Sequence, residues 1–101
     1  EDGDFDRKVL LLEEVDSFIP RFEALAPDVF LITGDHSTPS IMSGHSWHPV
    51  PCVLFSPWVL PVQGSSFSER GCAAGSLGHI HSTSLMSLAL AHAGRLAKFG
   101  A

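Results

Sequence analysis

The chain has 101 residues, of which 45% are hydrophobic and 17% are charged, and its formal net charge is −5. With six Lys and Arg against eleven Asp and Glu, the charge argues against binding to nucleic acid or to an anionic membrane surface. Two cysteines are too few for a disulfide-stabilised secreted scaffold, no apolar run approaches the ~20 residues of a membrane span, and the acidic N-terminus is unlike a signal peptide. We therefore expect a soluble, cytoplasmic protein that forms one small domain or part of a larger one.

The first predicted element is an amphipathic helix over residues 4–26. Asp4 is suited to cap its N-terminus, because a carboxylate there accepts a hydrogen bond from a free backbone N–H. Pro20 predicts a break followed by a short second turn, and Pro27 ends the segment. The apolar residues recur at steps of three and four and so share one helix face: Phe5, Val9, Leu12, Val15, Ile19 and Phe22.

Two short apolar runs follow, over residues 28–34 and 51–57, each bounded by proline or glycine. Such runs are typical of strands that are buried on both faces, as in a mostly parallel sheet. A helix, a buried strand, a loop and another buried strand together predict a layered α/β fold.

The remainder of the chain divides into an irregular part and a second helix. Residues 57–81 are rich in Gly, Ser and Pro and predict irregular structure. Residues 82–98 predict an amphipathic helix that Ser82 or Thr83 would cap. Its apolar stripe comprises Leu85, Leu88, Ala89, His92 and Leu96.

The segment with the clearest chemical potential begins where the first predicted strand ends. Ligand sites in open α/β sheets lie beyond the carboxyl ends of the strands, and Gly34 allows a sharp turn there. Outside the strand, the adjacent side chains of Asp35 and His36 can converge on one point, where an oxygen and an imidazole nitrogen suit a divalent metal such as Mn or Zn. The alternative is a local turn in which Asp35 and Ser37 satisfy backbone groups.

His45 lies nine residues beyond His36, directly before the second predicted strand. This spacing permits a shared site without requiring one. Two adjacent ligands and one distant histidine do not complete a catalytic metal site, which needs at least three protein ligands. Neither Cys52 nor Cys72 has the surroundings of a nucleophile. For the other four histidines a surface or core role is favoured: His48, His79, His81 and His92.

Several segments resemble the end of the archaeal-type cofactor-independent phosphoglycerate mutases, which belong to the alkaline phosphatase superfamily. The likeness covers nearly the whole chain, and the pair TGDHSTP and HSWHPVP at this separation is its most specific part. The segments are EDGDFDRKV at the start, TGDHSTP (33–39), HSWHPVP (45–51), FSERGCAAGSLG (67–78) and the terminal AKFGA.

The resemblance implies that residues 1–101 are a single C-terminal segment of a larger metalloenzyme domain. The fold would be part of an alkaline-phosphatase-like layered sheet, with two buried strands flanked by two amphipathic helices. The complete enzyme would be an isomerase that interconverts 3-phosphoglycerate and 2-phosphoglycerate in glycolysis through a phosphoserine. The nucleophilic serine would lie upstream, in the part of the enzyme that this segment accompanies, so the isolated chain is expected to be inactive.

The same resemblance implies two divalent metal ions, with manganese favoured and zinc, cobalt or magnesium as alternatives. Asp35 and His36 would ligate the metal that activates the serine, and His45 would ligate the second metal. Glu1 falls where the family has a further histidine ligand, and a carboxylate can also bind a metal. Arg70, in the FSERG segment, would hold a phosphate or a carboxylate, or else stabilise its loop by an ion pair with Glu69 or with an upstream acidic residue.

Two alternatives to the mutase stay open on the sequence. The chain could be a non-catalytic structural or metal-binding segment, because its ligands lack their upstream partners. It could also belong to a phosphatase of the same superfamily, which shares the Asp-His pair and the distant histidine. The HSWHPVP and FSERG segments favour the mutase.

Overall fold

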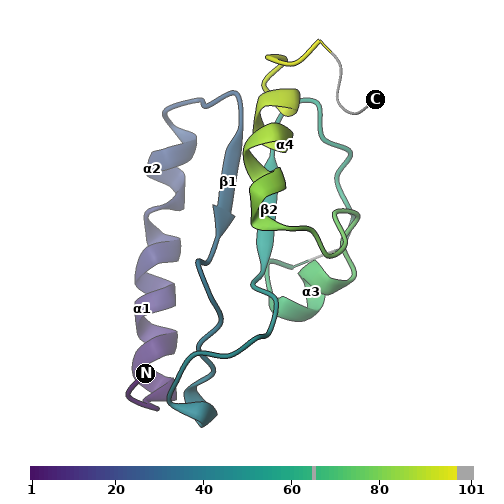
Figure 1. The fold of residues 1–101 in the computed structure, drawn as a ribbon. Coiled ribbons are helices and arrows are strands. Elements are labelled where there is room, and N and C mark those ends of the chain that lie inside the picture. Colours follow the sequence, from purple (N-terminus) through teal and green to yellow (C-terminus); the bar gives the residue numbers. More distant parts are fainter. Residues whose placement is uncertain (65, 98–101) are drawn as a thin grey trace. The chain divides into compact units, whose positions relative to one another are not determined.

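The structure is a computed structural model that describes residues 1–64 and 66–97. It divides into two compact units (Figure 1). The first unit combines residues 1–27 with residues 35–50, and the second combines residues 28–34 with residues 51–101. The chain therefore passes between the units more than once, and each unit contains segments that are distant in the sequence.

The first unit begins with two consecutive helices, α1 (Phe5–Ser17) and α2 (Ile19–Glu23). The expected cap is confirmed, because the side chain of Asp4 accepts a hydrogen bond of 2.9 Å from the backbone N–H of Arg7. The expected break is also confirmed. It falls at Phe18, which places Pro20 in the first turn of α2, where the missing N–H of proline costs no helical hydrogen bond.

The second half of the first unit, residues 35–50, contains one short 3-10 helix, η1 (Ser40–Met42). A left-handed residue, Ser43, ends this turn with φ of 47°. The helix η1 packs against α1. Residues 35–50 are therefore fixed by turns and by contacts with the N-terminal helix rather than by a sheet.

The second unit contains an antiparallel strand pair, β1 (Phe30–Thr33) and β2 (Cys52–Phe55), with Phe30 opposite Phe55 and Thr33 opposite Cys52. The expectation of parallel strands is wrong here. A parallel connection needs a crossover, usually a helix, whereas residues 34–51 return the chain with only η1 between the strands. The expectation of burial on both faces is also wrong for this chain, because each described strand has one neighbour and only Leu54 within the pair is buried.

Three short helices follow in the second unit: α3 (Glu69–Ala73), the 3-10 turn η2 (Ser82–Ser84) and α4 (Leu85–His92). The helix α3 corrects the prediction of irregular structure over residues 57–81. It begins because the side chain of Ser68 accepts a hydrogen bond of 3.1 Å from the backbone N–H of Gly71.

The last predicted helix is shorter than expected. Ser82 and Thr83 lie in η2 and do not act as side-chain caps. The helix α4 ends at His92, and Gly94, with φ of 67°, gives the left-handed conformation that commonly follows a helix end. The half-buried residues of α4 include four members of the predicted stripe, Leu85, Leu88, Ala89 and His92. The fifth, Leu96, lies beyond the end of α4 and is exposed, so its prediction as a helical stripe residue is wrong. Residue 98 of the predicted helix, and most of the terminal AKFGA segment, lie outside the described residues.

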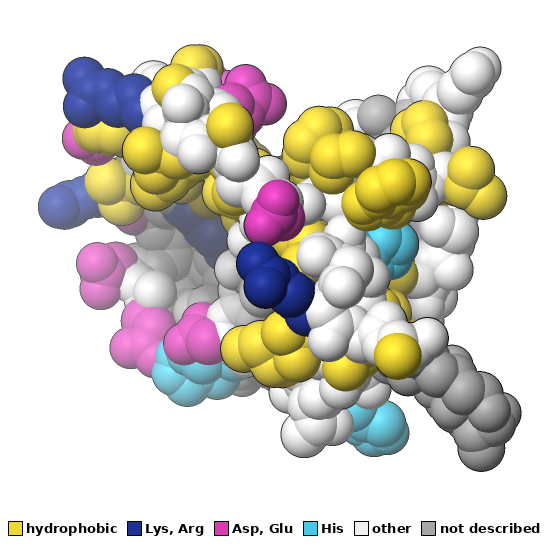
Figure 2. All heavy atoms as spheres, turned by 90° about the horizontal axis from the view of Figure 1, so that it is seen from above, with side chains coloured by type: hydrophobic (Ala, Val, Ile, Leu, Met, Phe, Trp, Pro, Cys, Tyr) yellow, Lys and Arg dark blue, Asp and Glu magenta, His cyan; other side chains and the backbone are white. Residues whose placement is uncertain are grey.

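The described residues bury very little. Only Leu54, at 9% exposed, and Ser56, at 3% exposed, are buried. Large hydrophobic side chains are exposed throughout, as the yellow groups in Figure 2 show for one face. The chain is α/β, as expected, but the two-stranded sheet is smaller than a layered sheet. Within the residues described, no helix has the length and apolar character needed to cross a membrane.

Candidate metal site

The segment after β1 turns sharply and brings Asp35 into contact with its own neighbour. The Oδ1 atom of Asp35 accepts a hydrogen bond of 2.9 Å from the backbone N–H of His36. This hydrogen bond, assisted by the nearby His36 imidazole, lowers the pKa of the Asp35 carboxyl below its ordinary value. Asp35 therefore stabilises the local turn, as the alternative interpretation of the sequence required, and also presents an ionised carboxylate.

An isolated antiparallel bridge sets the geometry of the next residues. Ser37 pairs with Ser46, and the backbone N–H of Ser46 donates a hydrogen bond of 2.9 Å to the carbonyl of Ser37. Because the two segments run antiparallel, the residue after Ser37, Thr38, lies opposite the residue before Ser46, His45. Because side chains alternate between faces, His36 and Thr38 share one face. The bridge thus explains how His36 and His45, nine residues apart, come together.

One hydroxyl group, that of Thr38, lies within hydrogen-bonding distance of both imidazole rings. The Oγ1 atom of Thr38 is 3.1 Å from Nδ1 of His36 and 3.1 Å from Nδ1 of His45. The ring centroids of the two histidines are 3.9 Å apart, with the rings at 61°. The spacing of the two histidines permitted this convergence without requiring it, and no motif in the sequence marked Thr38.

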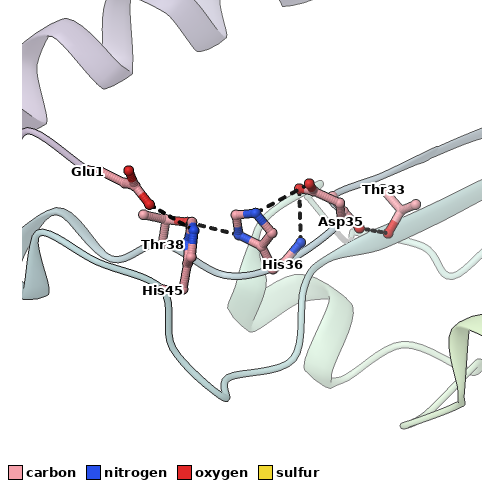
Figure 3. Close-up of polar contacts among 7 residues, drawn as sticks. Glu1, Thr33, Asp35, His36, Thr38 and His45 are labelled. Atoms are coloured by element: carbon pink, nitrogen blue, oxygen red, sulfur yellow. Dashed lines mark hydrogen bonds and ion pairs between the residues drawn. The ribbon is translucent and has the colours of Figure 1, made fainter.

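A carboxylate lies at the other nitrogen of each imidazole. The Oδ2 atom of Asp35 is 3.3 Å from Nε2 of His36, and the Oε1 atom of Glu1 is 2.7 Å from Nε2 of His45. Figure 3 shows the resulting continuous series of contacts. Hereafter we call it the polar series; it runs through Asp35, His36, Thr38, His45 and Glu1.

The backbone of Gly3 lies close to the side chain of Ser43, and this close approach helps to place Glu1 beside His45. Gly3 has φ of 74°, and a Cβ atom at this position would lie 2.6 Å from Oγ of Ser43. The helix α1 contributes as well, because Nζ of Lys8 donates a hydrogen bond of 2.7 Å to the backbone carbonyl of Thr38. These roles of Gly3 and Lys8 were not predicted from the sequence. Only the glycine carried a signal, since Gly3 follows two acidic residues and precedes a helix cap.

An open hollow of about 410 Å³ adjoins the polar series within the first unit. Acidic residues of the N-terminus line it together with two cationic side chains, Arg7 and Lys8, and with Leu11. His36, Thr38 and His45 line its other part. A small polar molecule or ion in this hollow would therefore meet both carboxylates and cations.

The side chains of the polar series fit a divalent metal in part. Two ligand atoms about 2.1 Å from one ion lie about 3.0–3.4 Å apart at tetrahedral or octahedral angles. The distance of 3.3 Å between Oδ2 of Asp35 and Nε2 of His36 matches this spacing. The distance of 2.7 Å between Oε1 of Glu1 and Nε2 of His45 is shorter and is that of a hydrogen bond. The residues that the structure describes contain no cluster of three or more His, Cys, Asp or Glu suited to one ion. Each pair is thus at most half of a coordination sphere.

The remaining predicted residues lie elsewhere. Arg70 is exposed in α3 and forms no ion pair with another described residue, so the alternative pairing with Glu69 is absent there. Cys52 and Cys72 are free and half-buried, and burial raises the pKa of the Cys52 thiol, which agrees with the expectation that it is no nucleophile.

The histidines outside the polar series differ in their surroundings. The Nδ1 atom of His48 lies 2.8 Å from Oγ of Ser46, and its ring stacks on Trp47 at 5.0 Å between centroids. His79 and His81 are exposed, and His92 is half-buried at the end of α4. These positions agree with the expected surface and packing roles.

Residues 1–92 match the family model described as the Metalloenzyme superfamily, so the chain belongs to this superfamily. The match includes every member of the polar series and Arg70. More specific relatives are proteins named probable 2,3-bisphosphoglycerate-independent phosphoglycerate mutase. The one from Thermotoga neapolitana is 55% identical over all 101 residues, that from Aquifex aeolicus 52%, and that from Thermus thermophilus 50%.

The chain spans 25% of the length of each of these relatives. No solved structure matches it. The comparisons therefore define the superfamily and a group of similar enzymes.

Proposed function

We propose that this chain is the C-terminal segment of a metal-dependent phosphoglycerate mutase. The complete enzyme interconverts 3-phosphoglycerate and 2-phosphoglycerate through a phosphoserine, as a cytoplasmic enzyme of glycolysis. The observation that carries the proposal is the identity of 50–55% along the whole chain to proteins named as such mutases. These names also favour the mutase over a phosphatase.

The polar series is the proposed metal-binding part. Asp35 and His36 would hold one divalent ion, and His45 with Glu1 would hold the second. The 3.3 Å between Oδ2 of Asp35 and Nε2 of His36 supports the first pair directly. Glu1 lies beside His45 at a hydrogen-bonding distance of 2.7 Å, so the second pair would have to separate slightly to hold an ion. Carboxylate and imidazole ligands suit manganese, which we propose, and also accommodate zinc or cobalt. Further ligands would come from the rest of the enzyme.

When bound, the metals would lower the pKa of the serine hydroxyl and neutralise charge on the phosphoryl group. The residues of this chain would bind the metal ions and orient the substrate. The hydrogen bond from the backbone N–H of His36 lowers the pKa of Asp35 and so favours the carboxylate form that a metal ion binds. Arg70 is exposed and free of ion pairs with described residues, so its guanidinium is available to a phosphate or carboxylate.

The rest of the enzyme is the proposed partner of the exposed apolar surface. Monomeric proteins rarely expose large apolar patches, yet most of the apolar residues of α1 and those on one face of β2, Val53 and Phe55, are exposed here. The relatives are four times as long as this chain, and we propose that the corresponding additional residues cover these apolar side chains. In that setting β1 and β2 would gain neighbours and become part of an alkaline-phosphatase-like layered sheet, with both faces covered.

The decisive experiment compares two histidine variants of the full-length protein that contains this chain. We expect His36→Ala to lower the rate of 3-phosphoglycerate isomerisation by at least about 100-fold, because loss of a ligand should exceed the 10–100-fold losses typical of residues behind ligands. His48→Ala is the matched control, since its imidazole lies in the same unit, where it hydrogen-bonds Ser46 and stacks on Trp47 outside the polar series.

Three outcomes would count against the proposal. His36→Ala activity like that of the wild type in metal-depleted buffer would refute the metal role. Equal losses in both variants would show that the effect is structural. Net release of inorganic phosphate without isomerisation would assign the protein to the phosphatases instead.

A further inference from the structure

We propose that Thr38 is a positioning residue whose single hydroxyl group orients both candidate metal-binding histidines. This inference rests on the proposed function, because it concerns the same site. It assigns a role to a residue that the family resemblance left without one. The hydroxyl is the only described group that contacts both imidazoles, at 3.1 Å from each Nδ1 atom.

The position of Thr38 is itself fixed from two sides. Its backbone carbonyl accepts a hydrogen bond of 2.7 Å from Nζ of Lys8, which comes from α1, thirty residues earlier. The bridge between Ser37 and Ser46 holds the adjacent backbone. Thr38 is half-buried, whereas the side chains of His36 and His45 are 47% and 56% exposed. The hydroxyl is therefore better held than the rings that it contacts.

The contacts at the carboxylate ends cannot hold the rings alone. Ion pairs between exposed side chains contribute little to stability, and both carboxylates here are largely open to solvent. A residue that hydrogen-bonds the second nitrogen of a ligand histidine fixes the ring orientation and the tautomer. By occupying Nδ1 of both rings, Thr38 leaves both Nε2 atoms directed away from itself, toward Asp35 and Glu1.

Hydrogen-bond counting shows why a hydroxyl suits this place. A threonine hydroxyl donates one hydrogen bond and accepts others, so it can serve one imidazole as donor and the other as acceptor. Valine has nearly the same shape but neither capacity. Serine keeps the hydroxyl and loses only a methyl group. These two substitutions at Thr38 therefore separate the hydrogen bonds from the volume of the side chain.

The test uses the full-length protein that contains this chain, titrated calorimetrically with Mn²⁺ alone. We expect Thr38→Val to weaken Mn²⁺ binding by about 10-fold or more, the range typical of residues that orient ligands. We expect Thr38→Ser to bind like the wild type. Thr33→Val is the matched control, because the Thr33 hydroxyl donates to the carbonyl of Pro51 in the strand pair and contacts neither histidine.

A second readout examines the imidazoles without metal. In ¹⁵N NMR spectra of the metal-free protein, the Nδ1 resonances of His36 and His45 should shift in Thr38→Val and stay in place in Thr33→Val. Thr38→Ala replaces Thr38→Val if the latter does not fold, as judged by circular dichroism. A merely structural role of Thr38 would lower the melting temperature and leave these resonances in place in the folded protein.

The outcomes separate this inference from the proposed function. If His36→Ala loses Mn²⁺ binding but Thr38→Val binds normally with unchanged imidazole resonances, the positioning role is overturned and the metal site stands. If the wild type binds no Mn²⁺, or if Asp35→Ala with His36→Ala binds as well as the wild type, the proposed function itself fails, and with it the role of Thr38 toward a metal.

Discussion

The two units differ in what holds them together. In the first unit, side-chain polar contacts connect residues that are distant in sequence: Lys8 reaches the carbonyl of Thr38, and Glu1 reaches His45. In the second unit, the long-range order comes from the backbone pairing of β1 with β2 and from the burial of Leu54 and Ser56.

The candidate metal ligands and the buried residues therefore lie in different units of this chain. The whole polar series lies in the first unit, where the described residues are not buried. The buried residues lie in the second unit. Substitutions in the second unit should therefore lower the free energy of unfolding, whereas those in the first should mainly alter metal binding.

The largest expected effect on stability is at Leu54. Replacement by alanine leaves a cavity in the least exposed apolar position, so we expect Leu54→Ala to lower the free energy of unfolding by about 2–4 kcal/mol. Leu54→Met, which conserves volume, should cost less than about 1.5 kcal/mol. Denaturant titration of both variants measures the difference, and equal costs would break the assignment of stability to the second unit.

The next effect compares one glycine from each unit. Gly3 and Gly78 both have positive φ, of 74° and 61°, so alanine at either position is strained by about 1–2 kcal/mol. A Cβ atom at Gly3 would also lie 2.6 Å from Oγ of Ser43, so this hydroxyl would have to turn away or the N-terminus would have to shift, whereas one at Gly78 meets open space. We expect Gly3→Ala to weaken Mn²⁺ binding as well, because it displaces the N-terminus. Gly78→Ala should change stability alone, and a shared loss of Mn²⁺ affinity would contradict the comparison.

A smaller effect is expected at the cap of α1. Asp4→Ala removes the acceptor for the N–H of Arg7, which should cost about 1 kcal/mol and reduce the helical signal in circular dichroism. Asp4→Asn keeps an acceptor and is the control. The same exchange at the cap of α3, Ser68→Ala, should reduce helicity less, because α3 has five residues and α1 has thirteen.

The smallest effect should appear only at alkaline pH. Burial raises the pKa of the Cys52 thiol above its ordinary value, so the folded state holds this proton more tightly than the unfolded state does. Its contribution to stability is complete below the pKa of the unfolded thiol and is lost as the pH rises through the folded value. Unfolding measured at pH 8 and pH 10 should show a pH slope that Cys52→Ala reduces and Cys72→Ala retains.

The sequence predicted well those features that depend on neighbours along the chain. The Asp4 cap and the break before Pro20 follow from the hydrogen-bonding capacity of single residues, and both are found. It also singled out Asp35 and His36, whose contact is local. Features that depend on a distant partner were harder. The antiparallel direction of the strands was missed because an apolar run specifies burial, not the direction of its neighbour.

Short helices and connecting residues were missed for a related reason. Helix α3 has too few residues to show a hydrophobic period, and only the cap at Ser68 marks it. Residues 93–97 lie beyond the end of α4, because Gly94 adopts a left-handed conformation that helical periodicity does not reveal. Thr38 gave no signal in the sequence, since its role depends on the register between Ser37 and Ser46.

The interleaved order of the two units also has a consequence for synthesis on the ribosome. Every member of the polar series has been made once residue 45 has been added, whereas β1 can pair with β2 only after residues 52–55 follow. Domains tend to fold as their residues emerge, from the N-terminal end onward. The contacts around Thr38 can therefore form first in the growing chain. The pairing of β1 with β2 would follow, after residues 35–50 have adopted their turns.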